Sequence, residues 1–263
     1  KQLMASGVRG KDIAVLFRVN ALSRSLEEGF NKNGLNYKLV GGMKFYERAE
    51  IKDLIAFFRI ITNSHDNFSL KRIINKPKRG IGKTTIDKLE AKSIELKKPI
   101  FEIIEELDSN ELVAVVGKKN ARTLKVFLAS IMDLKDSLKE SKMRFLDIFE
   151  ETFDFRASFE NAPDGYDRQA NIDEFYGYVR DYFIQNPMQE LDNFLNEIAL
   201  DSEQSELENE AVSMMSIHAS KGLEFKHLFI IGLEEGFFPI NGDGSDIEEE
   251  RRLGYVSFTR AMD

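Results

Sequence analysis

The sequence has no cysteine and only three histidines among its 263 residues. The absence of cysteine excludes disulfide bonds and thiolate metal sites. The histidines are not clustered, so no zinc site or other metal site is expected. No apolar run approaches the roughly 18 residues that a membrane-spanning helix needs. The first residues, KQLMASGVRGKD, lack the apolar centre of a signal peptide. We therefore expect a cytoplasmic protein without a membrane partner.

The net charge of −8 is spread unevenly along the chain. Residues 69–100 include ten Lys and Arg but only three acids, whereas 201–210 and 234–250 carry five and seven acids and no base. A basic segment of this kind can bind phosphates while the acidic segments keep the chain soluble. A solvated basic face explains the charge alone equally well.

Both ends of the chain combine short apolar runs with helical patterns. Strands are predicted over 12–17 (DIAVLF), 36–41 (NYKLVG), 211–217 (AVSMMSI) and 227–233 (HLFIIGL). Helices are predicted over 21–34, 48–63 and 246–263, and acids near its start favour the last of them. Strands that alternate with helices indicate an α/β fold with a parallel sheet.

The middle of the chain, from about residue 68 onward, shows almost only helical periodicity. We therefore predict a parallel-sheet domain formed by residues 1–67 and 206–263, interrupted by a mostly helical inserted domain over 68–205. The acidic stretch 201–210 is the expected return linker. The chain ends without the closing strand that such a sheet could accept, which indicates a piece of a longer protein.

The stretch 76–85, KPKRGIGKTT, ends like a phosphate-binding loop, whose pattern is G-x-x-x-x-G-K-[ST]. Pro77 stands where the first glycine should be, and proline lacks the backbone freedom of glycine. The preceding run FSLKRIIN has helical periodicity, although a phosphate loop must follow a strand. We therefore expect that this stretch does not bind ATP, and that the sheet domain lacks its own phosphate loop.

The stretch 216–239, SIHASKGLEFKHLFIIGLEEGFFP, is the most distinctive in the chain. A predicted strand delivers His218, a turn of small residues ends at Gly222, and Glu224 follows. Small residues let the backbone approach a ligand closely. Histidine and lysine can donate to phosphate oxygens, and glutamate can accept from a hydroxyl. The pattern indicates a nucleotide or nucleic-acid site, with a purely structural histidine as the alternative.

Several stretches resemble motifs of UvrD/Rep/PcrA-type superfamily 1 DNA helicases, in the family's order. IHASKGLEF, GLEEGFFP and EEERRLGYVSFTRA resemble motifs of the C-terminal half, and DIAVLFRVNALSRSLEE resembles the fourth motif. YKLVGGMKFYERAEIKDLIAFFRII resembles the segment after it, and LKRIINKPKRGIGKTTIDKL resembles the start of the inserted accessory domain. The resemblance implies that the sheet domain is the second RecA-like domain, called 2A, and that the helical domain is accessory domain 2B.

The resemblance also implies an activity. It indicates the C-terminal fragment of an ATP-dependent helicase that moves 3′→5′ along one DNA strand through a hinge cycle. The implied partners are single-stranded DNA, duplex DNA and DNA repair or replication proteins. A first RecA-like domain of the same chain is expected to precede this sequence, with the phosphate loop and the Mg²⁺ ligands for ATP. The fragment alone is then expected not to hydrolyse ATP.

The resemblance assigns roles residue by residue. Arg260, in VSFTRA, matches the family's arginine finger, which stabilises charge that develops on the γ-phosphate. Glu224 matches the glutamate that contacts the nucleotide sugar. The alternative for Arg260 is an ion pair with glutamates on its own helix. Relatives commonly have a DNA-contacting histidine after Phe-Pro, where this chain has Ile240. The positions that match single-strand DNA contacts are Arg18, Asn20, Lys44 and His218, with Lys221 facing phosphate or coupling the two sites.

The KPKRGIGKTT stretch matches a helix–hairpin–helix loop with which the family touches duplex DNA. Two glycines permit a tight turn that exposes backbone N–H groups to a phosphate. Thr84 or Thr85 is expected to cap the next helix, whose N-terminus favours an anion. The expected duplex-binding residues are Lys78, Arg79, Gly80, Ile81, Gly82, Lys83 and Thr84.

Two other interpretations stay open at this point. A helicase–nuclease subunit shares these motifs and requires a nuclease domain downstream. A non-catalytic DNA-binding or partner-binding module would keep the fold without a phosphate-loop domain upstream. The length of the intact chain and the reading frame before Lys1 would distinguish both from a helicase.

Overall fold

The computed structural model describes residues 1–203, 210–240 and 246–262, so most of the predicted linker lies outside the described residues. Contacts divide the chain into two units. Lys1–Arg48 and Ile198–Asp263 form the first, which we call the sheet unit, and Ala49–Glu197 form the second, the helical unit. The chain therefore folds as an α/β unit that is interrupted by a helical unit.

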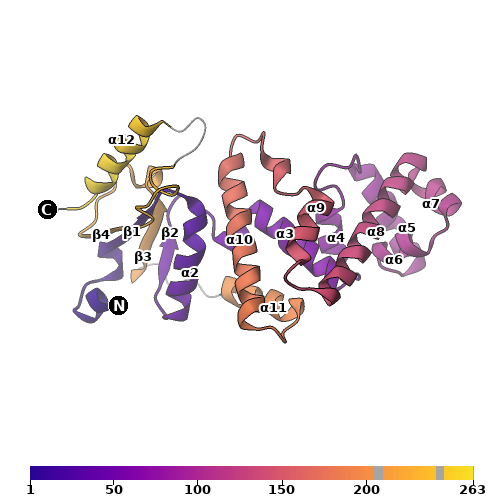
Figure 1. Ribbon diagram of the computed structural model, residues 1–263, viewed down its shortest axis with the longest axis horizontal. Helices are drawn as coiled ribbons and strands as arrows, with labels where there is room; N and C mark the ends of the chain where they lie inside the picture. The colour runs from indigo at the N-terminus through magenta and orange to yellow at the C-terminus, as the bar shows by residue number, and fades with distance from the viewer. Residues whose placement is uncertain (204–209, 241–245, 263) are drawn as a thin grey trace. The chain divides into compact units, whose positions relative to one another are not determined.

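The sheet unit contains four strands that all run in the same direction. They are β1 (Ile13–Phe17), β2 (Tyr37–Leu39), β3 (Val212–Ser216) and β4 (His227–Ile230). The order in the sheet is β2-β3-β1-β4, and every neighbouring pair is parallel. The predicted parallel sheet is confirmed, and the chain enters it twice, once before and once after the helical unit (Figure 1).

Helices cover both faces of this sheet. Ile13, Val15 and Phe17 alternate along β1 and pack with residues of α2 (Ser23–Lys32) and the short α1 (Gln2–Ala5). Leu16 points to the other face and packs in a cluster with Leu253 of α12 (Ile247–Phe258). A strand that is buried on both faces reads as a continuous apolar run, which is why DIAVLF was recognisable.

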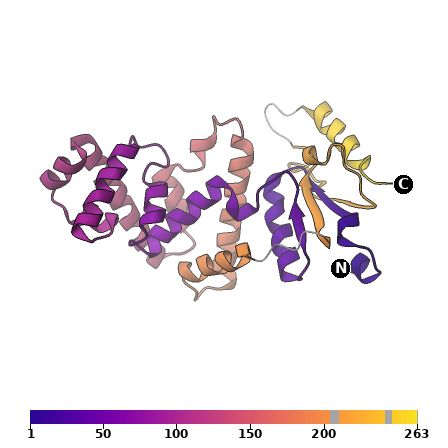
Figure 2. The same ribbon diagram turned by 180° about the vertical axis from the view of Figure 1, so that it is seen from behind.

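The helical unit consists of nine helices within the described residues. They are α3 (Ala49–Thr62), α4 (Asn67–Ile73), α5 (Lys83–Leu96), α6 (Ile100–Glu106), α7 (Ser109–Val116), α8 (Lys118–Glu140), α9 (Phe145–Phe153), α10 (Gly165–Gln185) and α11 (Leu191–Glu203), the last of which runs past the unit boundary. Both views show α5 to α8 gathered at one end of this unit (Figures 1 and 2). No helix in the described ranges is long and apolar enough to cross a membrane.

Phenylalanine rings form the core of the helical unit. Phe57 and Phe58 of α3 are fully buried. The Phe57 ring lies 5.2 Å from that of Phe149, and the Phe58 ring lies 5.3 Å from that of Phe145, both in edge-to-face geometry. Edge-to-face pairs add about 1 kcal/mol beyond the burial of their area. Because α3 supplies this core, contacts place it in the helical unit, although the sequence analysis assigned residues 49–67 to the sheet domain.

Phe57→Ala is expected to lower the free energy of unfolding of the helical unit by about 3–5 kcal/mol, since it removes a ring that contacts four other rings. Denaturant unfolding followed by helical circular dichroism measures the change. Phe68→Ala is the matched control, because the Phe68 side chain is 74% exposed, and it should change the same quantity by less than about 0.5 kcal/mol. Equal losses for the two variants would contradict the packing described here.

Candidate nucleic-acid and nucleotide sites

Four strand ends meet at one edge of the sheet, which we call the carboxyl edge. Because β1 to β4 are parallel, the residues that follow each strand project from the same side. Arg18 follows β1 directly, and the turn containing His218 follows β3. The 40–44 turn follows β2, and its Val40 N–H still bonds to the Met214 carbonyl of β3. In open parallel sheets, ligands bind outside this edge.

Two glycines bring the turns of the carboxyl edge into contact. A Cβ on Gly41 would lie 3.2 Å from the Ala219 Cβ, so the turn after β2 touches the turn after β3. Gly232 has a φ of +70°, and a Cβ there would lie only 2.6 Å from Leu22 Cδ1. The turn after β4 therefore packs on the Asn20–Leu22 turn after β1. Glycine allows both approaches without displacing a neighbouring side chain, and it adopts the left-handed backbone without strain.

The residues predicted to contact single-stranded DNA lie at the carboxyl edge, but their side chains differ in exposure. His218 and Lys221 are exposed to solvent. Asn20 and Lys44 are half-buried. These four residues come from three separate stretches of sequence, and they share the edge because the strands before them are neighbours.

Arg18, the fifth of these residues, is held by a carboxylate. Its Nε lies 3.0 Å and its Nη2 lies 2.8 Å from Glu250 Oε1 of α12. Glu250 is 6% exposed, and its Oε2 accepts a hydrogen bond of 3.2 Å from the Ile240 N–H. One buried carboxylate thus fixes the end of β1, the start of α12 and the residue after Phe-Pro. Glu250 was not among the residues predicted from the sequence, because it is one of three adjacent glutamates.

A second buried carboxylate positions Lys44. Glu27 of α2 accepts the Phe45 N–H at 3.2 and 3.3 Å and the Ser23 hydroxyl at 2.8 Å. Burial raises the pKa of the Glu27 carboxyl above its ordinary value, an effect that the bond from Ser23 and the charge of Arg48 partly offset. The backbone directly after Lys44 is therefore anchored in the sheet unit while the Lys44 side chain stays partly exposed.

The predicted nucleotide residues lie side by side away from the strand ends. Phe225 and Ala261 form a parallel bridge, in which the Phe225 N–H bonds to the Arg260 carbonyl at 2.9 Å. Glu224 therefore stands next to Arg260, and its side chain is exposed. The Arg260 guanidinium donates to the Val256 carbonyl at 3.1 Å and to the Leu223 carbonyl at 3.3 Å.

Arg260 forms no ion pair with any described carboxylate. The three glutamates at the start of α12 have other partners, because Glu248 pairs with Arg251, Glu249 with Arg252 and Glu250 with Arg18. The expected alternative, a pair between Arg260 and these glutamates, is therefore not seen in the described residues. The Arg260 charge is oriented by neutral carbonyls and is not neutralised by them.

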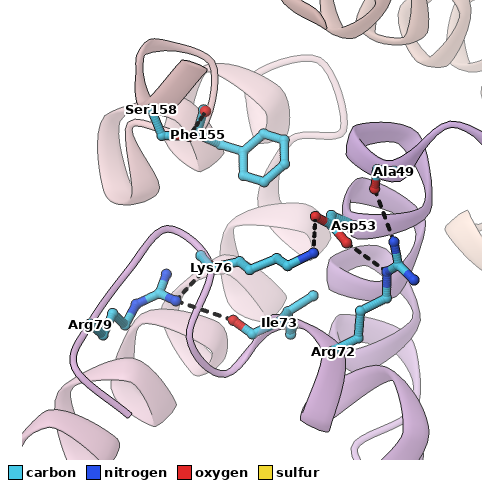
Figure 3. A network of polar contacts seen from close by, with 8 residues as sticks. All are labelled: Ala49, Asp53, Arg72, Ile73, Lys76, Arg79, Phe155 and Ser158. Atoms are coloured by element: carbon cyan, nitrogen blue, oxygen red, sulfur yellow. Dashed lines mark hydrogen bonds and ion pairs between the residues drawn. The ribbon is translucent and has the colours of Figure 1, made fainter. Parts of the chain in front are cut away.

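The 76–84 loop of the helical unit is built around two side chains. Asn75 accepts the N–H groups of Arg79 at 2.8 Å and of Ile81 at 3.1 Å. Arg79 donates to the carbonyls of Ile73 at 3.2 Å and Lys76 at 2.5 Å, as Figure 3 shows. Its guanidinium carbon also lies 4.7 and 5.0 Å from the ring centres of Phe127 and Phe153. Burial lowers the pKa of Arg79 to about 10, so it stays charged at neutral pH.

The seven predicted duplex residues fall into two groups. Lys78, Gly80, Gly82, Lys83 and Thr84 are exposed. Arg79 and Ile81 point into the unit, and Ile81 is only 1% exposed. The expected threonine cap is wrong, because the N-cap of α5 is Gly82 and no side chain caps the helix. Thr85 is buried instead and accepts a hydrogen bond from Asn120 of α8.

A buried ion-pair cluster links this loop to α3. Asp53 is 3% exposed and contacts Arg72 Nε at 2.6 Å and Lys76 Nζ at 2.5 Å. Arg72 also donates to the Ala49 carbonyl (Figure 3). Two of the basic residues in the 69–100 segment are therefore structural, whereas Lys78 and Lys83 have no carboxylate partner within the described residues.

No group of three or more metal-ligating side chains converges in the described part of the chain. A basic surface on α8 was not predicted from the sequence, although α8 begins KKNAR after Gly117 and so repeats the Gly-Lys start of α5. That repeat was the available signal.

Comparison with known proteins agrees with this arrangement. Residues 1–263 match the family described as UvrD-like helicase C-terminal domain. The chain is 39% identical over 273 residues to the ATP-dependent DNA helicase PcrA of Staphylococcus aureus strain MRSA252. It is 38% identical over 277 residues to the protein of the same name from Staphylococcus epidermidis strain ATCC 35984. Each alignment covers 97% of this chain and 36% of the relative, so the chain spans about a third of their length.

Glu27→Gln is expected to change how stability depends on pH. With the pKa of Glu27 raised in the folded state, that state binds more protons than the unfolded state between pH 4.5 and the raised value. The free energy of unfolding of the natural chain, minus that of Glu27→Gln, should therefore fall as the pH rises through this window, by at most about 1.4 kcal/mol for each pH unit. Denaturant melts of both proteins from pH 4 to 8 measure the difference. A difference that rises with pH would contradict the assignment.

Proposed function

The chain belongs to the UvrD-like helicase C-terminal domain family, and on that premise we propose that it is the C-terminal part of an ATP-dependent DNA helicase that moves 3′→5′ along one strand. The observation that carries the proposal is the placement of Arg260 beside Glu224. A cation that has no carboxylate partner among the described residues, oriented by two carbonyls at the surface of a RecA-like unit, suits a group that acts on a nucleotide held by another domain.

Arg260 is the proposed arginine finger. Bound ATP with Mg²⁺ would supply the transferable γ-phosphate, and Arg260 would stabilise the negative charge that develops on it. The bonds from its Nε and Nη1 to the Val256 and Leu223 carbonyls limit the rotamers of the side chain. Less conformational entropy is then lost when the guanidinium engages a phosphate. Glu224 is proposed to accept a hydrogen bond from the sugar of the same nucleotide.

A preceding RecA-like domain is the proposed partner of the surface around Arg260. The outer face of α12 exposes Ile247, Tyr255 and Phe258 at 53%, 73% and 62%. Their spacing places them along one side of the helix. An apolar stripe of this kind beside a charged functional residue is typical of an interaction surface, and it suits a domain that closes over the nucleotide.

The carboxyl edge is the proposed track for single-stranded DNA. Lys44, His218 and Lys221 can donate to phosphates without reading the base sequence. The Arg18 guanidinium donates to Glu250 through Nε and Nη2, so only its other side is offered to a phosphate. The exposed part of the 78–84 loop is the proposed duplex contact, with the N-terminus of α5 and the Lys83 charge toward a phosphate.

Arg260→Ala in the intact enzyme is expected to lower kcat for DNA-stimulated ATP hydrolysis by about 10³- to 10⁵-fold. Steady-state hydrolysis in the presence of saturating single-stranded DNA measures it. Arg252→Ala is the matched control, since Arg252 lies on α12, the helix that precedes Arg260, is exposed and pairs with Glu249. A normal kcat for Arg260→Ala would contradict the proposal, as would ATP hydrolysis by the 263-residue chain alone that survives this substitution.

Lys83→Gln and Arg79→Gln are expected to weaken duplex binding in different ways. Lys83 is exposed, so its loss should lower the slope of log K against log salt by about 0.9, the value for one phosphate contact. Arg79 supports the loop from inside, so its loss should lower affinity and leave the slope unchanged. Fluorescence anisotropy with a labelled duplex at several salt concentrations measures both. Lys97→Gln, at the far end of α5, is the control, and a slope change for Arg79→Gln would refute its internal role.

A further inference from the structure

A basic groove runs along α8 beside the 76–84 loop. It has a volume of about 470 Å³, and its walls come from the loop, from α8 and from the end of α9. Lys78 and Arg122 stand on the loop and on α8, with Val126, Ser130 and Thr152 along the groove. None of the described residues that line it is acidic. We call it the α8 groove.

The cations of the α8 groove are available to a ligand. Lys78 and Arg122 are exposed and have no carboxylate partner within the described ranges. Other cations of the helical unit are neutralised, for example Lys71 by Glu90 and Arg156 by Asp173. From Lys118 to Met132, α8 carries four basic residues and no acid. Unneutralised charge of one sign concentrated on one groove favours an anionic polymer.

The floor of the groove is rigid. Phe127 and Phe153 line it, and the Arg79 guanidinium lies against both rings. Arg79 in turn fixes the carbonyls of the loop that carries Lys78. Lys78 and Arg122 are therefore held on opposite walls of a preformed site, which reduces the entropy lost on binding.

The groove is continuous with the proposed duplex contact. Asn120 Nδ2 in the first turn of α8 donates to Thr85 Oγ1 in the first turn of α5 at 2.9 Å, so the two helix starts adjoin. Lys83 of α5 and Lys119 of α8 flank this junction and are exposed. One basic surface thus extends from the 78–84 loop across the start of α8 to the groove.

We propose that the α8 groove binds the phosphodiester backbone of the duplex, as a second contact beyond the 78–84 loop. The proposal rests on the proposed duplex binding of the helical unit. Arg122 and Lys78 hold successive phosphates, the Ser130 hydroxyl donates to a phosphate oxygen, and Val126, which is 61% exposed, packs against a sugar. Such contacts strengthen binding without sequence preference.

The test measures binding of the 263-residue chain to a blunt labelled duplex and to a single strand of equal length, by anisotropy across a salt series. Arg122→Gln and Lys78→Gln should each weaken duplex binding roughly three- to tenfold and lower the salt slope by about 0.9. Val126→Glu, which places a carboxylate in the groove, should weaken it further. Lys135→Gln, on α8 but outside the groove lining, should leave both quantities unchanged.

The outcomes separate this proposal from the proposed function. If Lys83→Gln weakens duplex binding but Arg122→Gln and Val126→Glu behave like Lys135→Gln, the groove proposal is overturned and the loop contact stands. If the groove variants affect only the single strand, the groove holds a different backbone and the duplex assignment is wrong. If the unchanged chain does not bind duplex at all, the proposed duplex contact itself fails. Circular dichroism of each variant confirms that it is folded.

Discussion

The direction of four short strands is the constraint on which the sheet unit depends. Because β1 to β4 are all parallel, residues that are up to about 200 positions apart in sequence leave the sheet at one edge. In the sheet, β3 lies between β1 and β2, but in the sequence it follows the helical unit. The chain must therefore return to the sheet after that unit. The close packing of Gly41 on the turn after β3, and of Gly232 on the turn after β1, follows from the same arrangement. A candidate DNA surface is therefore a consequence of topology before any single side chain is considered.

In the helical unit, the 76–84 loop presents positive charge although it has no regular secondary structure. Basic residues in and near this loop have two different roles. Lys76 and Arg72 neutralise the buried Asp53, and Arg79 is enclosed by two rings and two carbonyls. Lys78 and Lys83 of the same loop stay exposed and have no carboxylate partner in the part of the chain that the structure describes. Burying a charge requires compensation of this kind, and the compensation makes the loop rigid enough to hold its neighbours in place.

The sequence predicted the elements better than it predicted the roles of single residues. Period and composition located the four strands and the helices α2, α3 and α12, but the two-turn helices α6 and α7 are too short for a periodicity argument. Motif resemblance assigned Arg260 and Glu224 to one nucleotide site, which stays a prediction, and the bridge between Phe225 and Ala261 brings their backbones side by side. The interior positions of Arg79 and Ile81 could not be foreseen, because a basic stretch gives no indication of which cation will find aromatic partners. The burial of Glu27 and Glu250 could not be foreseen either, because a sequence does not distinguish a buried carboxylate from an exposed one until its partners are known.

One helix joins the two candidate sites of the sheet unit. Glu250, in the first turn of α12, holds Arg18 at the end of β1, and Arg260 lies just past the last residue of the same helix. From Glu250 to Phe258, the last residue of the helix, the rise of eight residues corresponds to about 12 Å. Under the proposed function, a displacement of Arg260 by a nucleotide would reach the Arg18–Glu250 pair through α12. If the two proposed sites are coupled through this helix, linkage requires that DNA bound at the carboxyl edge change the affinity for the nucleotide by the same factor as the nucleotide changes the affinity for DNA.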